Sequence, residues 1–170
     1  MSQKNRFSTR SLTISGMIAA VYAALTLALP VLSYGASSGW EMRISEALTI
    51  LPILLPEAVP GLTVGCLIAN LLSPVGALDV VFGTLATLIA ALGTRALRHR
   101  PWLAAACPVV SNALIVGTLL SSVYNLPLFF TMLQVGVGEL AAVLIGMILY
   151  HFLRDRGLVA ALEKQMESKK

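Results

Sequence analysis

The sequence predicts an all-α, polytopic membrane protein with six transmembrane helices. Of its 170 residues, 57% are hydrophobic and only 12% are charged, and the mean hydropathy is +0.84. A soluble domain carries about 25% charged residues, so this chain has too little polar surface to cover a water-exposed exterior. Disordered chains are poor in apolar residues, which excludes that class too. Eleven of the twelve Lys and Arg residues fall in three clusters separated by apolar sequence.

Six apolar runs follow one another along the chain, at residues 12–34, 44–55, 59–72, 77–96, 102–123 and 126–153. Four of them reach the roughly 20 residues that a helix needs to cross a hydrocarbon core of about 30 Å. The second and third runs are shorter, and Pro56, Glu57 and Pro60 interrupt the chain around the junction between them. Because proline breaks helices, these two runs are either halves of one broken span or two short spans in a hairpin.

The placement of the basic clusters favours the hairpin. Lys and Arg concentrate in cytoplasmic loops, and only a six-span topology puts all three clusters on one side of the membrane. The sequence thus predicts a cytoplasmic segment at 1–10, a single six-helix membrane domain at 11–153 and a cytoplasmic tail at 154–170. The two short helices would then be tilted, bordered by thinned bilayer or buried among the others.

Five polar residues lie inside the predicted spans. Glu46 and Asp79 open the second and fourth spans, Asn70 ends the third, and Asn112 and Glu139 lie near the middle of the fifth and sixth. The six-span topology places all five in the outer half of the membrane, where buried polar groups mark a pocket that opens outward. Alternatively, the two N-terminal acids complement helix dipoles and the asparagines only join helices.

Two further features have a structural and a functional interpretation. Trp40, in the first outer loop, is either an interfacial anchor or a lid over the pocket. In the first span, Ala19 with Ala23 and Ala20 with Ala24 repeat every four residues and form a smooth helix face. Such a face either packs inside the bundle or docks onto another membrane protein.

The sequence contains no enzyme signature. The zinc motif HExxH, the nucleophile motif GxSxG and the ATP-binding motif GxxxxGK[ST] are all missing, so we expect no enzyme activity, no metal and no cofactor. A membrane-embedded chain offers no soluble basic face, so we expect no nucleic-acid binding. Uphill transport by this chain would need a partner or an ion gradient.

Four spaced motifs resemble the QueT family, whose members are six-span substrate-binding (S) components of energy-coupling factor (ECF) transporters. They are RISEAL at 43–48, GLTVGCLIAN at 61–70, DVVFGTLATL at 79–88 and GVGE at 136–139. The resemblance covers residues 11–153.

The resemblance to the QueT family implies uptake of queuosine precursors, which are deazaguanine bases, across a prokaryotic cytoplasmic membrane. It also implies a membrane-embedded coupling protein and two ABC-type ATPase subunits as partners. S components carry an AxxxA pattern for docking to the coupling protein, and either alanine pair of the first span matches it.

The polar residues suit such a substrate. A guanine-like edge offers adjacent N–H and NH₂ donors that one carboxylate can accept together. We expect Glu139 to be this acceptor, with Asp79 as the second candidate and Glu46 nearby. Asn112 or Asn70 would bind the exocyclic oxygen. An aromatic side chain, Trp40 or Tyr124, is expected to stack on the ring of the base.

Other interpretations of the pocket stay open. The alternatives are an S component for another vitamin-like substrate, an ion-coupled transporter with Glu139 as proton carrier, and a membrane protein whose polar residues only join helices.

Overall fold

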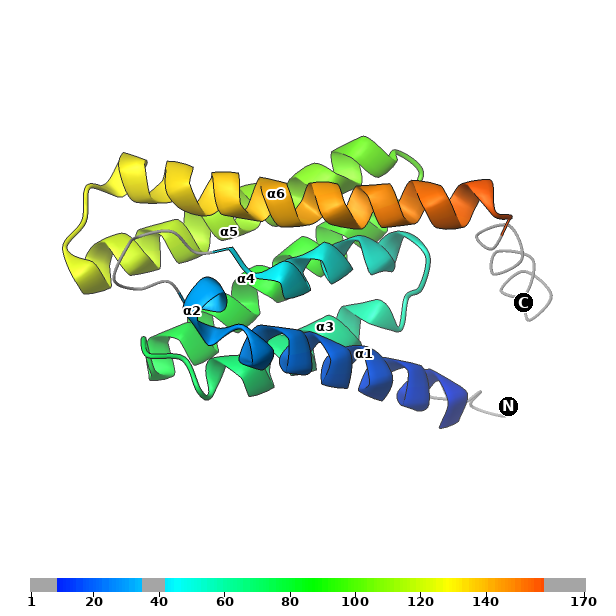
Figure 1. Cartoon of the computed structure of the whole chain (residues 1–170), viewed down its shortest axis with the longest axis horizontal. Coiled ribbons are helices and arrows are strands. Elements are labelled where there is room, and N and C mark those ends of the chain that lie inside the picture. The colour runs from blue at the N-terminus through cyan, green and yellow to red at the C-terminus, as the bar shows by residue number, and fades with distance from the viewer. Residues whose placement is uncertain (1–8, 35–41, 158–170) are drawn as a thin grey trace, which may run out of the picture.

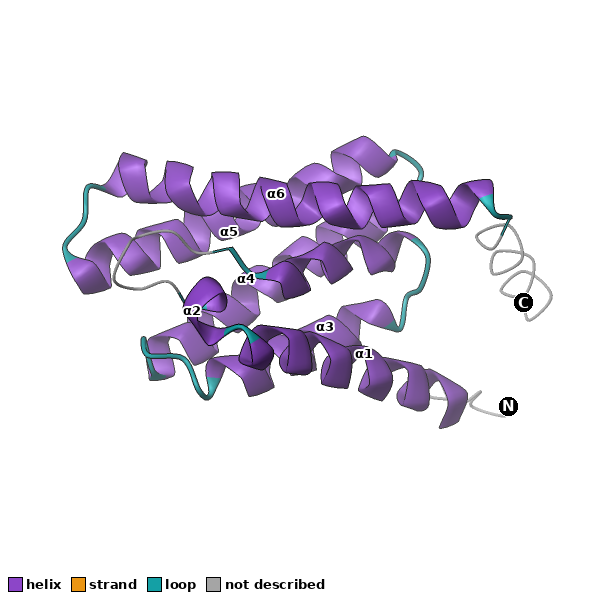
Figure 2. Ribbon diagram, in the orientation of Figure 1, coloured by secondary structure: helices purple, strands orange, loops and turns teal. Residues whose placement is uncertain are grey.

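The computed structural model describes residues 9–34 and 42–157, and every regular element in them is helical (Figure 2). The all-α prediction is therefore confirmed. In chain order the elements are α1 (Thr9–Ala28), α2 (Pro30–Ser33), the 3₁₀ helix η1 (Ile44–Ile53), α3 (Ala58–Asn70), α4 (Ala77–Ala96), α5 (Pro101–Tyr124) and α6 (Leu128–Asp155). By length and composition α1, α4, α5 and α6 can span a membrane. The shorter η1 and α3 leave the count of six spans a prediction.

The helices run alternately between two ends of the bundle. In Figure 1, α1, α3 and α5 run one way, and η1, α4 and α6 run the other. The start of α1 and the end of α6 therefore lie at the same end, with the turn between α4 and α5. We call this the basic end, because its described residues include Arg10, Arg95, Arg98, Arg100, Arg154 and Arg156. The alternation is the arrangement that a hairpin of η1 and α3 requires.

The first apolar run is not one continuous helix. We expected it to extend over residues 12–34, but α1 ends at Ala28 and the four-residue α2 begins at Pro30. Proline has no N–H to continue the hydrogen-bond ladder, and its ring clashes with the preceding turn. At the first position of a new helix neither problem arises, so the break falls there.

The second run forms the centre of the bundle. The helices α1, α3, α4, α5 and α6 pack each against the next, and η1 contacts all five. A 3₁₀ helix of ten residues is unusual, since such runs seldom exceed three or four residues. At the C-terminal end of η1, the Arg95 guanidinium donates hydrogen bonds to the carbonyls of Pro52 and Ile53 at 3.1 and 3.3 Å. Of the three arrangements expected for the short runs, burial among the other helices describes η1.

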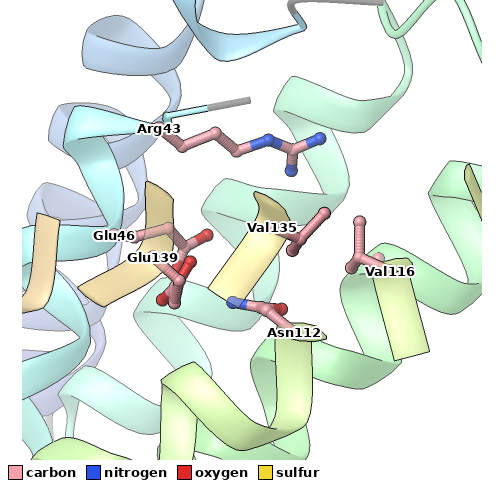
Figure 3. A pocket seen from close by; sticks show the side chains of 7 residues that line it. Arg43, Glu46, Asn112, Val116, Val135 and Glu139 are labelled. Carbon is pink, nitrogen blue, oxygen red and sulfur yellow. The ribbon is translucent and has the colours of Figure 1, made fainter. Parts of the chain in front are cut away.

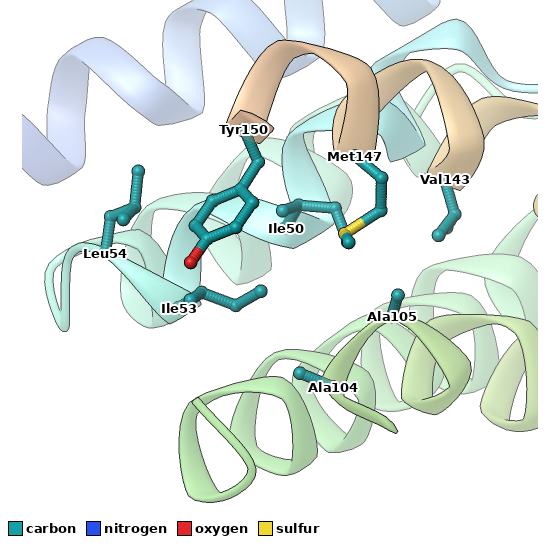
Figure 4. Close-up of a cluster of buried hydrophobic side chains, with 8 residues drawn as sticks. All are labelled: Ile50, Ile53, Leu54, Ala104, Ala105, Val143, Met147 and Tyr150. Atoms are coloured by element: carbon teal, nitrogen blue, oxygen red, sulfur yellow. The ribbon is translucent and has the colours of Figure 1, made fainter. Parts of the chain in front are cut away.

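An apolar cluster lies in the half of the bundle nearest the basic end (Figure 4). It joins the last residues of η1 to the start of α5 and the end of α6. The members are Ile50, Ile53, Leu54, Ala104, Ala105, Val143, Met147 and Tyr150. Between η1, α5 and α6, hydrocarbon side chains therefore close the interior toward the basic end.

Candidate functional site

A small polar pocket lies in the half of the bundle away from the basic end. Glu46 of η1, Asn112 of α5 and Glu139 of α6 line it together, and Figure 3 shows their polar groups converging on one space. Val116 of α5 and Val135 of α6 form an apolar wall beside them. The remaining lining residues are Arg43 and Gly83. Two carboxylates, an amide and a guanidinium are thus gathered from α5, α6, η1 and the residue that directly precedes η1.

Glu46 is fixed to α1 through Tyr22. The Tyr22 hydroxyl donates a hydrogen bond to Oε1 of Glu46, and both side chains are buried. One turn further along α1, the Thr26 hydroxyl donates to the Ser45 hydroxyl at 2.7 Å. These bonds hold the start of η1 against α1 and aim the Glu46 carboxylate into the pocket.

Arg43 closes the pocket from the end opposite the apolar cluster. Its guanidinium forms an ion pair with Asp79 at 3.1 Å and donates to Oδ1 of Asn70 at 3.0 Å. Its Nε donates to the Ser33 carbonyl at 3.2 Å, and its Cζ lies 5.3 Å from the centre of the Tyr34 ring. We call Arg43, Asp79 and Asn70 the clasp. It ties the start of η1 to α3 and α4, and its arginine and aspartate are only 8% and 2% exposed.

A glycine makes room for the clasp. A Cβ added to Gly83 would lie 2.5 Å from Oδ1 of Asp79 and 2.6 Å from Nδ2 of Asn70. Contacts that short essentially never occur at a real Cβ, so any larger residue here would displace one of the two side chains. Gly83 also lines the pocket.

The pocket is nearly closed in this structure. Its volume is about 20 Å³, whereas a cavity needs about 10–15 Å³ to hold one water molecule and small-molecule sites are usually larger than about 300 Å³. A fused-ring base would therefore enter only after the walls move apart.

The structure brings together some of the predicted site residues and separates others. Glu46, Asn112 and Glu139 line the pocket, whereas Asp79 and Asn70 lie beside it and hold Arg43. Tyr124 ends α5 and packs on the apolar cluster of Ala86, Val116, Leu120 and Val135. Trp40 lies outside the described residues.

Four lining residues were not proposed as site residues from the sequence, and they are Arg43, Gly83, Val116 and Val135. A signal for the first was present, because Arg43 is the one cation outside the three basic clusters. An arginine at the start of a predicted span needs polar partners when it is buried, and Asp79 and Asn70 are such partners. Within the described residues, no three His, Cys, Asp or Glu side chains lie close enough together to hold a metal ion.

Comparison with known proteins gives one positive result. Residues 12–155 match a family described as QueT transporter. No curated protein and no solved structure matches the chain.

Proposed function

Since the chain belongs to the QueT transporter family, we propose that it is the substrate-binding component of an ECF importer for queuosine precursors. A transporter with four long apolar helices is a membrane protein. In the proposed arrangement all six helical segments cross a prokaryotic cytoplasmic membrane, with both termini and the basic end in the cytoplasm. The pocket then opens outward.

The observation that carries the proposal is that Glu139 and Asn112 line the same pocket beside an apolar wall. A carboxylate accepts the adjacent N–H and NH₂ groups of a guanine-like edge, and an amide can donate to the exocyclic oxygen. Val116 and Val135 offer the hydrocarbon contact that a flat ring needs. Deazaguanine bases present this combination of a polar edge and an apolar face.

The proposed partners are a coupling protein in the membrane and two ABC-type ATPase subunits. The chain itself has no ATP-binding motif. On α1, Gly16, Ala20 and Ala24 are exposed and lie four residues apart, whereas Ala19 and Ala23 are only 5% and 7% exposed. The side of α1 that carries Ala19 packs closely against α3, because a Cβ added to Gly65 of α3 would lie 2.8 Å from the Ala19 carbonyl oxygen. We therefore assign docking to the Gly16–Ala20–Ala24 face, not to Ala19 and Ala23.

A thermal-unfolding panel on the detergent-purified chain tests the proposal. A ligand that binds only the folded state raises the melting temperature, and a concentration 100 times Kd stabilises by about 2.7 kcal/mol. We expect 7-deazaguanine bases to raise the melting temperature, and adenine, pyrimidines and common vitamins to leave it unchanged. Stabilisation by a vitamin and not by any deazaguanine would point to a different substrate and contradict the proposal.

A further inference from the structure

A groove opens on the surface of the bundle between α1 and α3, at the basic end where both helices begin (Figure 1). Its volume is about 720 Å³. The lining residues are Ser11, Leu12, Ser15, Gly16, Ala19, Pro56, Glu57, Pro60 and Val64. Beneath it the two helices touch, since a Cβ added to Gly61 of α3 would lie 2.8 Å from the Ser15 carbonyl oxygen. Leu12 and Val64 are 67% and 47% exposed, so the groove faces outward from the bundle.

Glu57 is the one charged residue that lines this groove. It directly precedes α3, but its side chain makes no capping hydrogen bond to that helix. Its Oε1 instead accepts a hydrogen bond from the Ser11 hydroxyl of α1 at 3.1 Å. Its backbone carbonyl accepts one from the Ser15 hydroxyl at 2.9 Å. These two bonds hold the carboxylate at the groove, between α1 and α3.

No cation lies within ion-pair distance of Glu57 in the part of the chain that the structure describes, where the ion pair joins Arg43 to Asp79. Arg95 is near enough to interact with the charge of Glu57, but its guanidinium donates to backbone carbonyls of η1. Glu57 is half-buried, and a charge withdrawn from water is costly unless an opposite charge accompanies it. The groove therefore favours an occupant that brings positive charge.

The groove is continuous with the proposed docking face. Gly16 belongs to both, and Leu12 extends the exposed row of Gly16, Ala20 and Ala24 by one turn toward the basic end. In the proposed orientation, a partner helix that lies along this row passes Glu57 near the cytoplasmic surface. Membrane proteins concentrate Lys and Arg on that side of the membrane. Such a helix thus brings cations to the level of the carboxylate.

On the basis of the proposed function, we infer that the groove between α1 and α3 receives a helix of the coupling protein, and that a lysine or arginine of this helix forms an ion pair with Glu57. The small residues of α1 permit the close approach. The ion pair fixes the position of the partner helix along α1 and disfavours a partner that has an acidic residue at this level. The same charge disfavours an anionic lipid headgroup.

Charge reversal in the reconstituted importer tests for the ion pair. The purified chain is titrated against the complex of the coupling protein and both ATPases. We expect Glu57→Lys to raise the dissociation constant of this assembly at least about tenfold, because like charges that face each other across an interface are strongly unfavourable. The matched control is Asp155→Lys, which reverses an exposed acid at the end of α6 and should assemble like the wild type.

A second reversal identifies the cation of the partner. Each Lys or Arg near the cytoplasmic ends of the coupling protein's helices is changed in turn to Glu, and we expect one change to restore assembly with Glu57→Lys. Wild-type affinity of Glu57→Lys for the unaltered complex would overturn the ion pair. A loss of affinity that none of these changes restores would overturn it too.

A photo-crosslinker tests the occupant of the groove while every charge stays in place. Benzoylphenylalanine replaces Val64 on the groove wall, and we expect it to link to the coupling protein in the assembled importer. Links only to lipid, or to a second copy of this chain, would assign the groove to those occupants and overturn the inference.

The outcomes separate the ion pair of Glu57 from the proposed function. If the wild-type chain binds a deazaguanine and assembles with the coupling protein while charge reversal has no effect, the ion pair is wrong and the proposed function stands. If the wild-type chain does not assemble, the proposed partnership fails and the ion pair fails with it.

Discussion

Replacing Arg43 with glutamine is expected to lower the free energy of unfolding by about 3–5 kcal/mol, the usual cost of removing one partner from a buried ion pair. The guanidinium holds Asp79, Asn70 and the Ser33 carbonyl at once, so its loss leaves the Asp79 carboxylate buried without a counter-charge. Thermal or denaturant unfolding in detergent measures the change.

A double mutant shows whether the loss of stability comes from the Asp79 carboxylate that is left without its counter-charge. Arg43→Gln combined with Asp79→Asn removes both charges, and we expect it to recover a large part of the stability lost in Arg43→Gln alone. Arg98→Gln is the control, because Arg98 is an exposed arginine at the basic end. It should change stability little. Additive losses from the two clasp substitutions would mean that Arg43 and Asp79 do not stabilise each other.

Ala20→Trp is expected to abolish transport by the assembled importer while the isolated chain still binds its substrate. Ala20 is exposed on α1, and its neighbours Gly16 and Ala24 continue the same low surface. A tryptophan there prevents a partner helix from approaching closely, since close approach depends on small side chains. Uptake in cells or proteoliposomes that contain the coupling protein and ATPases measures the first effect. Equilibrium binding to the purified chain measures the second.

Two tryptophan controls make the docking result specific. Ile148→Trp places the same bulk on α6 at a side chain that is 71% exposed, and it should leave transport intact. Ala23→Trp forces the bulk into the bundle, so we expect lost stability and lost binding from overpacking. From the sequence we expected the same docking role for Ala23 as for Ala20, and the two variants distinguish a buried alanine from an exposed one. Normal transport by Ala20→Trp would remove α1 as the docking surface.

The long helices could be predicted from the sequence because the residues at their ends are typical of helix boundaries. The run at 77–96 became α4 with the same bounds, since Gly76 precedes it and a basic cluster follows. The short run at 44–55 was predictable as a helix but not as a 3₁₀ helix. Its geometry depends on contacts with five neighbours and on Arg95, which is more than 40 residues away.

The residues that line the pocket were easier to predict from the sequence than the contacts between their side chains. Depth along a helix placed Glu46 at the start of its span and Asn112 and Glu139 near the middle of theirs, all in the outer half, and the structure brings the three to one pocket. The pairing of Asp79 with Arg43 joins residues 36 apart in sequence across two elements. Spacing alone cannot show such a pairing, so the contact of Asp79 with Arg43 was not predicted, and a ligand role for Asp79 stays a prediction.

An equilibrium titration of 7-deazaguanine against the wild-type chain and Glu139→Gln tests the central claim, that the pocket around Glu139 binds a guanine-like edge. The glutamine side chain keeps the size of Glu139 but replaces one accepting oxygen with a donor that faces the donors of the base. We expect the dissociation constant to rise at least about tenfold, with the melting temperature of the unliganded protein changed far less than in Arg43→Gln. Equal affinity for the two proteins would show that Glu139 does not bind the edge and would contradict the account.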